Sequence, residues 1–238
     1  MEIKGKRILV TGANRGLGRA LAFAFATAGA RKPEDIEQLK ADALADGAPI
    51  TPVRLDVRFE EDVAAVVALG PVDILVNNAA IAVYGGPLTA EFADIRNEIE
   101  TNYLAVVRLV QAFAPTMIEQ GDGMIVNIAT IFAKVNLPIV GTYCATKAAL
   151  LSLGQALRAH LADKGVRVLT VLPSTIDTDM SRGADVPKMT KEFVAGEILR
   201  IIREEPIDPP IGDEARGILE GLARDPLSME QTFAQIRE

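Results

Sequence analysis

The chain has 238 residues, of which 49% are hydrophobic and 24% charged, so one large or two small folded domains are expected rather than disorder. The formal net charge of −7, without any basic run, argues against nucleic acid as a partner. A single cysteine and a single histidine exclude an internal disulfide and a metal site of the zinc type.

The N-terminal residues 1–7 carry three basic side chains but lead into an apolar run too short for a signal peptide. No stretch of eighteen apolar residues follows elsewhere, so no helix is expected to cross a membrane. We therefore expect a cytoplasmic protein.

Apolar runs of strand length alternate with segments of helical period along the chain. The predicted strands are 7–11, 50–57, 72–77, 124–129 and 166–172, and the predicted helices are 18–28, 34–45, 60–69, 91–120 and 143–163. Three of the strands are apolar on consecutive residues, which is typical of strands covered on both faces. This alternation, with neither a flexible linker nor a repeat, predicts one doubly wound α/β domain with a parallel sheet over residues 1–238.

One strand of this alternation is weak or missing. After the first predicted helix, residues 30–34 lead directly into the next helical pattern without an apolar run. Pro33 suits the first turn of a helix better than a strand. A doubly wound fold would normally place its second strand there.

A glycine-rich turn, residues 11–18, joins the first strand to the first helix. Glycines at such a turn permit close approach of a pyrophosphate, and the helix N-terminus offers free N–H donors to it. The turn is not a P-loop, because no Gly-Lys-Ser/Thr follows. Glycines in a strand–helix turn can also serve purely structural ends.

Polar residues follow two further strands. Asp56 ends the second predicted strand, and residues 77–80 (Asn-Asn-Ala-Ala) end the third. In open parallel sheets ligands bind at the carboxyl ends of the strands. Each residue taken singly could instead be a helix cap or a turn residue.

Tyr143 and Lys147 lie four residues apart at the start of a predicted helix, so both share one helix face. A neighbouring cation favours the tyrosinate and should lower the pKa of the phenol. Such a pair could act as the general acid that protonates an alkoxide while a hydride arrives.

Taken in order and spacing, residues 11–18, 77–80, Asn102, 143–147 and 173–178 resemble the short-chain dehydrogenase/reductase family over nearly the whole chain. The resemblance implies a Rossmann-like fold and the following roles. Tyr143 is the acid–base, Lys147 binds the nicotinamide ribose, and Asn102 positions a water. The cofactor is held by Gly12, Asn14, Arg15, Gly16, Leu17, Gly18, Arg31, Asp56, Val57, Asn78, Ala79, Lys147, Pro173, Ile176 and Thr178.

The chain departs from the family pattern at several positions. Thr130 stands where the family carries its substrate-orienting serine, and its extra methyl stiffens the side chain. We expect Thr130 to keep the role at a reduced rate or with altered substrate shape. Ala80 and Ser174 replace glycines of the family motifs and restrict the backbone there.

Basic residues near the weak or missing second strand favour NADP(H) over NAD(H). Arg15 and Arg31, with Lys32, could bind a 2′-phosphate, and no acidic residue for a free ribose hydroxyl stands between the end of the first predicted helix and Pro33. The alternative is that these side chains are solvated surface charges.

The substrate is expected to be a small apolar ketone, aldehyde or secondary alcohol. Its site should be formed by segments 79–91, 130–142 and 173–196, and the first two of these segments are mostly apolar.

The resemblance also implies a homodimer or homotetramer. The main alternative to a carbonyl reductase or alcohol dehydrogenase is a catalytically weak nucleotide-binding sensor or structural protein. Dehalogenation is disfavoured because Lys147 is intact.

Overall fold

A five-stranded parallel sheet forms the centre of the protein. The computed structural model describes residues 1–25, 28–30, 33–45 and 50–236. The strand order is β1-β4-β5-β6-β7, with bounds β1 (Ile8–Val10), β4 (Ile74–Asn77), β5 (Gly123–Ile128), β6 (Val166–Pro173) and β7 (Pro210–Ile211). Every residue of β1, β4 and β5 is buried, as their consecutive apolar residues predict.

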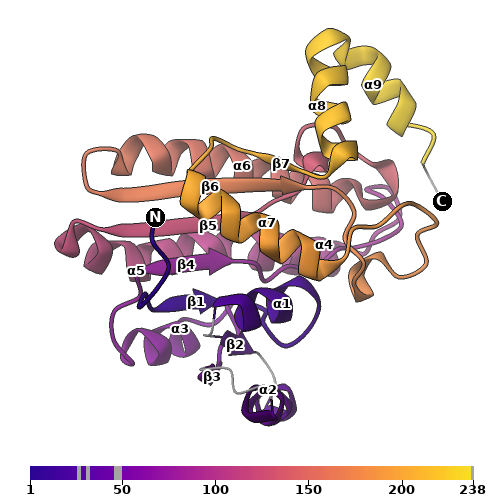
Figure 1. Cartoon of the computed structure of the whole chain (residues 1–238). Helices are drawn as coiled ribbons and strands as arrows, with labels where there is room; N and C mark the ends of the chain where they lie inside the picture. The colour runs from indigo at the N-terminus through magenta and orange to yellow at the C-terminus, as the bar shows by residue number, and fades with distance from the viewer. Residues whose placement is uncertain (26–27, 31–32, 46–49, 237–238) are drawn as a thin grey trace.

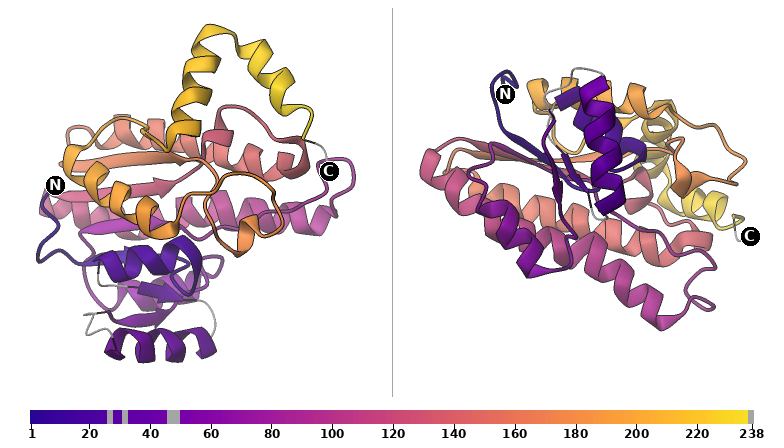
Figure 2. Two further views of the ribbon diagram at one scale, coloured as in Figure 1. Left: turned by 45° about the vertical axis from the view of Figure 1, so that its right-hand side comes forward. Right: turned by 90° about the horizontal axis from the view of Figure 1, so that it is seen from below.

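Helices cover both faces of this sheet (Figures 1 and 2). On one face α1 (Gly16–Phe25) and α7 (Lys191–Glu204) share a core with alternate strand residues such as Ile8, Ile74 and Val126. On the other face lie α3 (Glu60–Val67), α5 (Ala105–Gln120) and α6 (Gly141–Leu161), packed on the intervening strand residues. The doubly wound α/β fold predicted from the sequence is confirmed.

The second strand is as weak as the sequence predicts. β2 (Ala28–Ala30) pairs in parallel with β3 (Pro52–Arg54) as a separate two-stranded sheet. β2 lies beside β1, but no ladder joins these two strands in the described structure. The helix α2 (Pro33–Ala45) follows, with Leu39 buried against the core. Arg31, expected to bind the cofactor, lies outside the described residues.

The single helix predicted over 91–120 is interrupted. α4 (Phe92–Ile99) passes into a π-helical segment, Glu100–Leu104, which continues as α5. A π-helical turn inserts an extra residue per turn and commonly marks a functional site. Here it contains Asn102.

Two C-terminal helices, which the sequence analysis did not predict, form a hairpin: α8 (Asp213–Arg224) and α9 (Pro226–Phe233) (Figure 1, yellow). The hairpin packs on two short 3₁₀ helices, Ile131–Ala133 and Pro138–Val140. The rings of Phe132 and Phe233 meet edge to face, with 5.7 Å between their centroids. Acidic residues in the first turn of α8 and Pro226 at the start of α9 were the available sequence signals.

A helix long and apolar enough to traverse a lipid bilayer is not found in the described part of the chain.

Candidate active site

A cavity of about 720 Å³ lies at the carboxyl ends of β1, β4, β5 and β6. It brings together nearly all the residues that the sequence singled out, although they are far apart in the chain. Its lining includes Gly12, Asn14, Arg15, Gly16, Leu17, Gly18, Asp56, Val57, Asn78, Ala79, Thr130, Tyr143, Lys147, Pro173, Ile176 and Thr178. Asn102 does not belong to this lining.

The glycine-rich turn is locked to the end of β4. Thr11 Oγ1 accepts hydrogen bonds from the backbone N–H groups of Asn78 and Ala79, both at 3.0 Å. The Asn78 side chain donates in turn to the Thr11 carbonyl at 2.8 Å. Gly12 has a positive φ of 68°, and a Cβ there would lie 2.9 Å from Ala79 Cα. The backbone of the turn therefore requires glycine.

The N-terminus of α1 opens onto the cavity. Because α1 begins at Gly16, its first N–H groups have no partner within the helix and carry the positive end of the helix dipole. Such a terminus can hold the pyrophosphate of a dinucleotide. The volume lies within the range of cofactor and ligand pockets. The residues present therefore fit a nicotinamide dinucleotide.

Asp56, in the cavity lining, is held by Arg58, a residue that no sequence pattern singled out. Its two carboxylate oxygens accept from Arg58 Nε at 2.9 Å and from Nη2 at 2.7 Å. Arg58 also donates to Asn97 Oδ1 on α4 at 2.7 Å. A bidentate guanidinium–carboxylate pair is geometrically specific, so this side of the cavity is preorganised.

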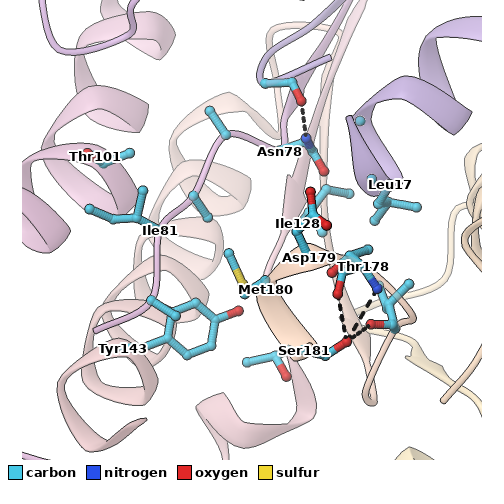
Figure 3. A pocket seen from close by; sticks show the side chains of 18 of the residues that line it. Leu17, Asn78, Ile81, Thr101, Ile128, Tyr143, Thr178, Asp179, Met180 and Ser181 are labelled. Atoms are coloured by element: carbon cyan, nitrogen blue, oxygen red, sulfur yellow. Dashed lines mark hydrogen bonds between the residues drawn. The ribbon is translucent and has the colours of Figure 1, made fainter. Parts of the chain in front are cut away.

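Tyr143 and Lys147 lie in the same compartment, as predicted. The Tyr143 hydroxyl points into the cavity (Figure 3), and Lys147 Nζ lies 5.6 Å from the centroid of the Tyr143 ring. Lys147 is only 3% exposed, and its Nζ donates to the Ile128 carbonyl at 2.8 Å. The ammonium therefore packs over the ring.

The prediction that Lys147 lowers the pKa of the Tyr143 phenol is wrong for the protein without a bound cofactor. Burial raises the pKa of Tyr143, and Cys144, Glu98 and Tyr84 raise it further. Burial also lowers the pKa of Lys147 to about 8, against the opposing influence of Glu98. Desolvation disfavours the charged form of both groups, and it outweighs the attraction that sequence spacing suggests. The phenol consequently holds its proton at neutral pH.

Asn102 lies behind the cavity wall. Its side chain exchanges two hydrogen bonds of 2.9 Å with the backbone of Ile81 and donates to Thr146 Oγ1 at 3.0 Å. Ile81 lines the cavity, so Asn102 holds this wall against α6. Both N–H donors of its amide are engaged by these bonds.

Thr130 lines the cavity, with its hydroxyl already hydrogen-bonded. Thr130 Oγ1 donates to the Pro173 carbonyl at 3.1 Å and accepts from the Phe132 N–H at 3.4 Å. It would have to exchange the first bond in order to donate to a substrate. Of the apolar segment that follows it, Phe132 and Val140 line the cavity, whereas Ile131 and Val135 are core.

Residues 176–182 close the cavity from the other side. Ser181 Oγ donates to the Ile176 carbonyl at 2.7 Å and accepts from the Thr178 N–H at 3.3 Å (Figure 3). Two contacts cross the mouth: the Tyr84 hydroxyl donates to the Met180 carbonyl, and Arg15 pairs with Asp179 at 3.2 Å. Sequence spacing carried no signal for these crossing contacts, because their partners are distant in the chain.

Comparison with known proteins agrees with this arrangement. The family model for short chain dehydrogenase matches residues 6–187. Ketoacyl reductase HetN of Nostoc sp. is 32% identical over 85% of this chain and 77% of its own length. D-erythrulose reductase of Gallus gallus is 36% identical over 76% of each chain.

A solved structure is also similar over nearly its full length. The short chain dehydrogenase from Burkholderia cenocepacia J2315, in complex with NADP, superposes with a TM-score of 0.88. It is 34% identical and covers 98% of this chain and 99% of its own. With a glycine turn, a tyrosine and a lysine sharing one cavity at the edge of a parallel sheet, this chain belongs to the short-chain dehydrogenases and is an NAD(P)-dependent oxidoreductase.

Proposed function

We propose that the protein is an NADPH-dependent carbonyl reductase that reduces small apolar ketones or aldehydes and oxidises the corresponding secondary alcohols in the reverse direction. One observation carries the proposal: the Tyr143 hydroxyl, Lys147 and the glycine-rich turn share a single cavity. A proton donor and a dinucleotide cradle on one cavity are what carbonyl reduction requires.

The residues divide the work as follows. NADPH, when bound, supplies the hydride. Tyr143 Oη donates its proton to the substrate oxygen as the carbonyl becomes an alkoxide, and the raised pKa keeps that proton available at neutral pH. Lys147 holds the nicotinamide ribose and restrains Tyr143, while Thr130 orients the substrate carbonyl. Asn102 supports the wall that these groups face.

An apolar substrate fits the remaining surface of the cavity. Ile81, Tyr84, Phe132, Val140 and Met180 line it beside Tyr143. Few polar anchors other than Thr130 face this part, so binding would depend on apolar contact. The edge-to-face contact of Phe132 with Phe233 ties this wall to the C-terminal hairpin.

NADPH, rather than NADH, is supported by Arg15 at the rim of the cavity. Its side chain is 69% exposed and pairs only at the surface with Asp179, so it can turn toward a phosphate at little cost. The similar Burkholderia cenocepacia enzyme holds NADP in its crystal structure. The proposed contribution of Arg31 lies outside the described residues.

A homodimer or homotetramer is part of the proposal. Large apolar side chains stay exposed along α4, the π-helical segment and α5: Phe92, Ile99, Leu104 and Ile118. A second copy of the chain packed on these helices would remove them from water.

The proposed function is tested by fluorescence titration with NADPH and NADH, followed by a panel of ketones and aldehydes monitored for cofactor oxidation. We expect tighter NADPH binding and turnover of apolar ketones. Binding without any turnover would support the alternative function, a catalytically weak nucleotide-binding sensor. That alternative is favoured by the Thr130 hydroxyl, which donates to the Pro173 carbonyl rather than into the cavity. Failure to bind either nucleotide would exclude both functions.

Thr130→Ser is expected to keep or increase turnover, whereas Thr130→Val should lower kcat about 10- to 100-fold. Serine keeps the hydroxyl without the methyl, and valine keeps the shape without a donor. Losing one neutral-to-charged hydrogen bond in the transition state corresponds to about 1.5–3 kcal/mol. The measurement is kcat of both variants in steady-state kinetics on the ketone that is reduced fastest. Equal activity of the two variants would remove Thr130 from the mechanism.

Arg15→Ala is expected to weaken NADPH binding about tenfold or more and to leave NADH binding unchanged. A guanidinium–phosphate contact is charge-assisted and corresponds to about 1.5–3 kcal/mol, whereas NADH has no phosphate there. Arg200→Ala, which removes an exposed arginine paired with Glu197 on α7, is the control. Equal weakening of both nucleotides by Arg15→Ala would contradict the assignment.

A further inference from the structure

A carboxylate that the proposed mechanism does not use is buried behind the active site. Glu98, in the last turn of α4, has an exposed fraction of 0%. A buried carboxylate needs a partner, because removing its charge from water is costly. Four residues later the π-helical segment carries Asn102, so both side chains lie on the same side of this helical stretch.

One oxygen of Glu98 holds the cavity wall. Its Oε1 accepts from the Val83 N–H at 2.7 Å, two residues after the Ile81 N–H that Asn102 binds at 2.9 Å. The two side chains therefore clamp the loop after β4 that presents Ile81 and Ala82 to the cavity. In the described part of the chain the second oxygen, Oε2, has no hydrogen-bond partner.

The charge of Glu98 acts on the groups of α6, against which α4 packs. Four side chains of α6 interact with the Glu98 carboxyl, Thr142 by a hydrogen bond that lowers the pKa of the carboxyl, and Tyr143, Cys144 and Lys147 through its charge. Tyr84, from the neighbouring loop, faces Tyr143. Lys147 is the only cation among these groups. Burial raises the pKa of Glu98, while Thr142, Val83 and Lys147 lower it.

Lys147 depends on the charge of Glu98 to keep its buried ammonium protonated. Its ammonium is bonded to a neutral carbonyl of Ile128, and the one carboxylate that raises its pKa is Glu98. A buried ammonium without an anion loses its proton readily. We propose that Glu98 is a positioning residue: Oε1 holds the cavity wall at Val83, and the carboxylate, buried where α4 packs on α6, is the counter-charge of the buried Lys147 ammonium.

Two substitutions separate these tasks. Glu98→Gln keeps an acceptor for the Val83 N–H and removes the charge. Glu98→Asp keeps the charge and shortens the reach to Val83. Asp94→Asn removes one charge from an exposed position on the same helix and is the control.

The direct test is the titration of Lys147 in the whole protein labelled with ¹³C-lysine, followed by NMR at Cε and assigned with Lys147→Arg. The midpoint, at about pH 8 in the unsubstituted protein, is expected to fall by about one pH unit or more in Glu98→Gln. It should stay in place in Glu98→Asp and Asp94→Asn. An unchanged midpoint in Glu98→Gln would overturn the proposal.

The kinetic test rests on the proposed reductase function. Reduction requires protonated Tyr143 and charged Lys147, so activity falls as the pH rises through either pKa. Because Glu98 raises both pKa values, Glu98→Gln should move this falling limb to lower pH. Glu98→Asp should lower kcat without moving the limb. A loss of kcat at an unmoved limb in Glu98→Gln would show a merely structural role and overturn the proposal.

The two tests fail independently. A protein that turns over no ketone, yet shows the shifted Lys147 midpoint, contradicts the reductase function and supports the Glu98–Lys147 pairing.

Discussion

Tyr143→Phe is expected to lower kcat for ketone reduction by about three orders of magnitude, within the range that general acid catalysis contributes. The substitution removes only the hydroxyl that points into the cavity (Figure 3). The ring would remain beneath Lys147, so the packing of α6 should not change. Because burial raises the pKa of Tyr143, the proposed proton donor keeps its proton over the whole neutral range.

The measurement is kcat and KM under saturating NADPH, together with the dissociation constant of NADPH by fluorescence. We expect the dissociation constant to stay within about twofold, because the phenol is a small part of the cofactor site. Tyr103→Phe, which changes a tyrosine outside the cavity lining, serves as the matched control and should keep its activity. A Tyr143→Phe protein with more than a tenth of the original kcat would contradict the assignment of the proton donor.

The fold was predictable where one physical signal dominated. Consecutive apolar residues in β1, β4 and β5 indicate strands buried on both faces, and the structure buries every one of these residues. The weakness of the second strand followed from its lack of an apolar run, and β2 indeed forms no ladder with β1 in the described residues.

The π-helical segment and the C-terminal hairpin could not be predicted in the same way. A single inserted residue at Glu100–Leu104 shifts the helical period too little for a pattern of apolar residues to reveal it. The helix α8 buries Ala215 and Ile218 on a 3₁₀ segment, a surface that exists only after folding. The local signals of the hairpin, the acidic first turn of α8 and Pro226 before α9, mark where the helices begin but do not say where the hairpin packs.

Within the candidate site, the sequence indicated which residues converge but not their electrostatics. The spacing of Tyr143 and Lys147 correctly predicts that they share a compartment. It wrongly predicts a lowered pKa for the phenol, because spacing reveals the nearby cation but not the burial that raises the pKa. Glu98 escaped notice for a related reason: its importance lies in its burial, which depends on how α4 packs on α6.

Gly18→Ala is expected to have the second large effect, on stability and cofactor binding together. A Cβ at Gly18 would overlap the Gly12 carbonyl oxygen and Asn78 Nδ2, two atoms that set the shape of the glycine-rich turn. Neither can yield easily, because Asn78 is hydrogen-bonded to Thr11 and Gly12 abuts Ala79. Overpacking of this kind costs about 1–3 kcal/mol, or about 2–4 °C of Tm per kcal/mol in a domain of this size.

The same substitution at Gly196 provides the contrast. Gly196 is exposed in α7, and nothing lies within 4 Å of a Cβ added there. Gly196→Ala should therefore raise the stability by about 0.5–1 kcal/mol, since alanine loses less backbone entropy in a helix. Thermal unfolding should move in opposite directions for the two variants, and NADPH affinity should fall about tenfold or more only in Gly18→Ala, because the displaced turn no longer fits the pyrophosphate. A Gly18→Ala protein that melts and binds NADPH as the unsubstituted protein does would show that the turn is not the cradle of the cofactor.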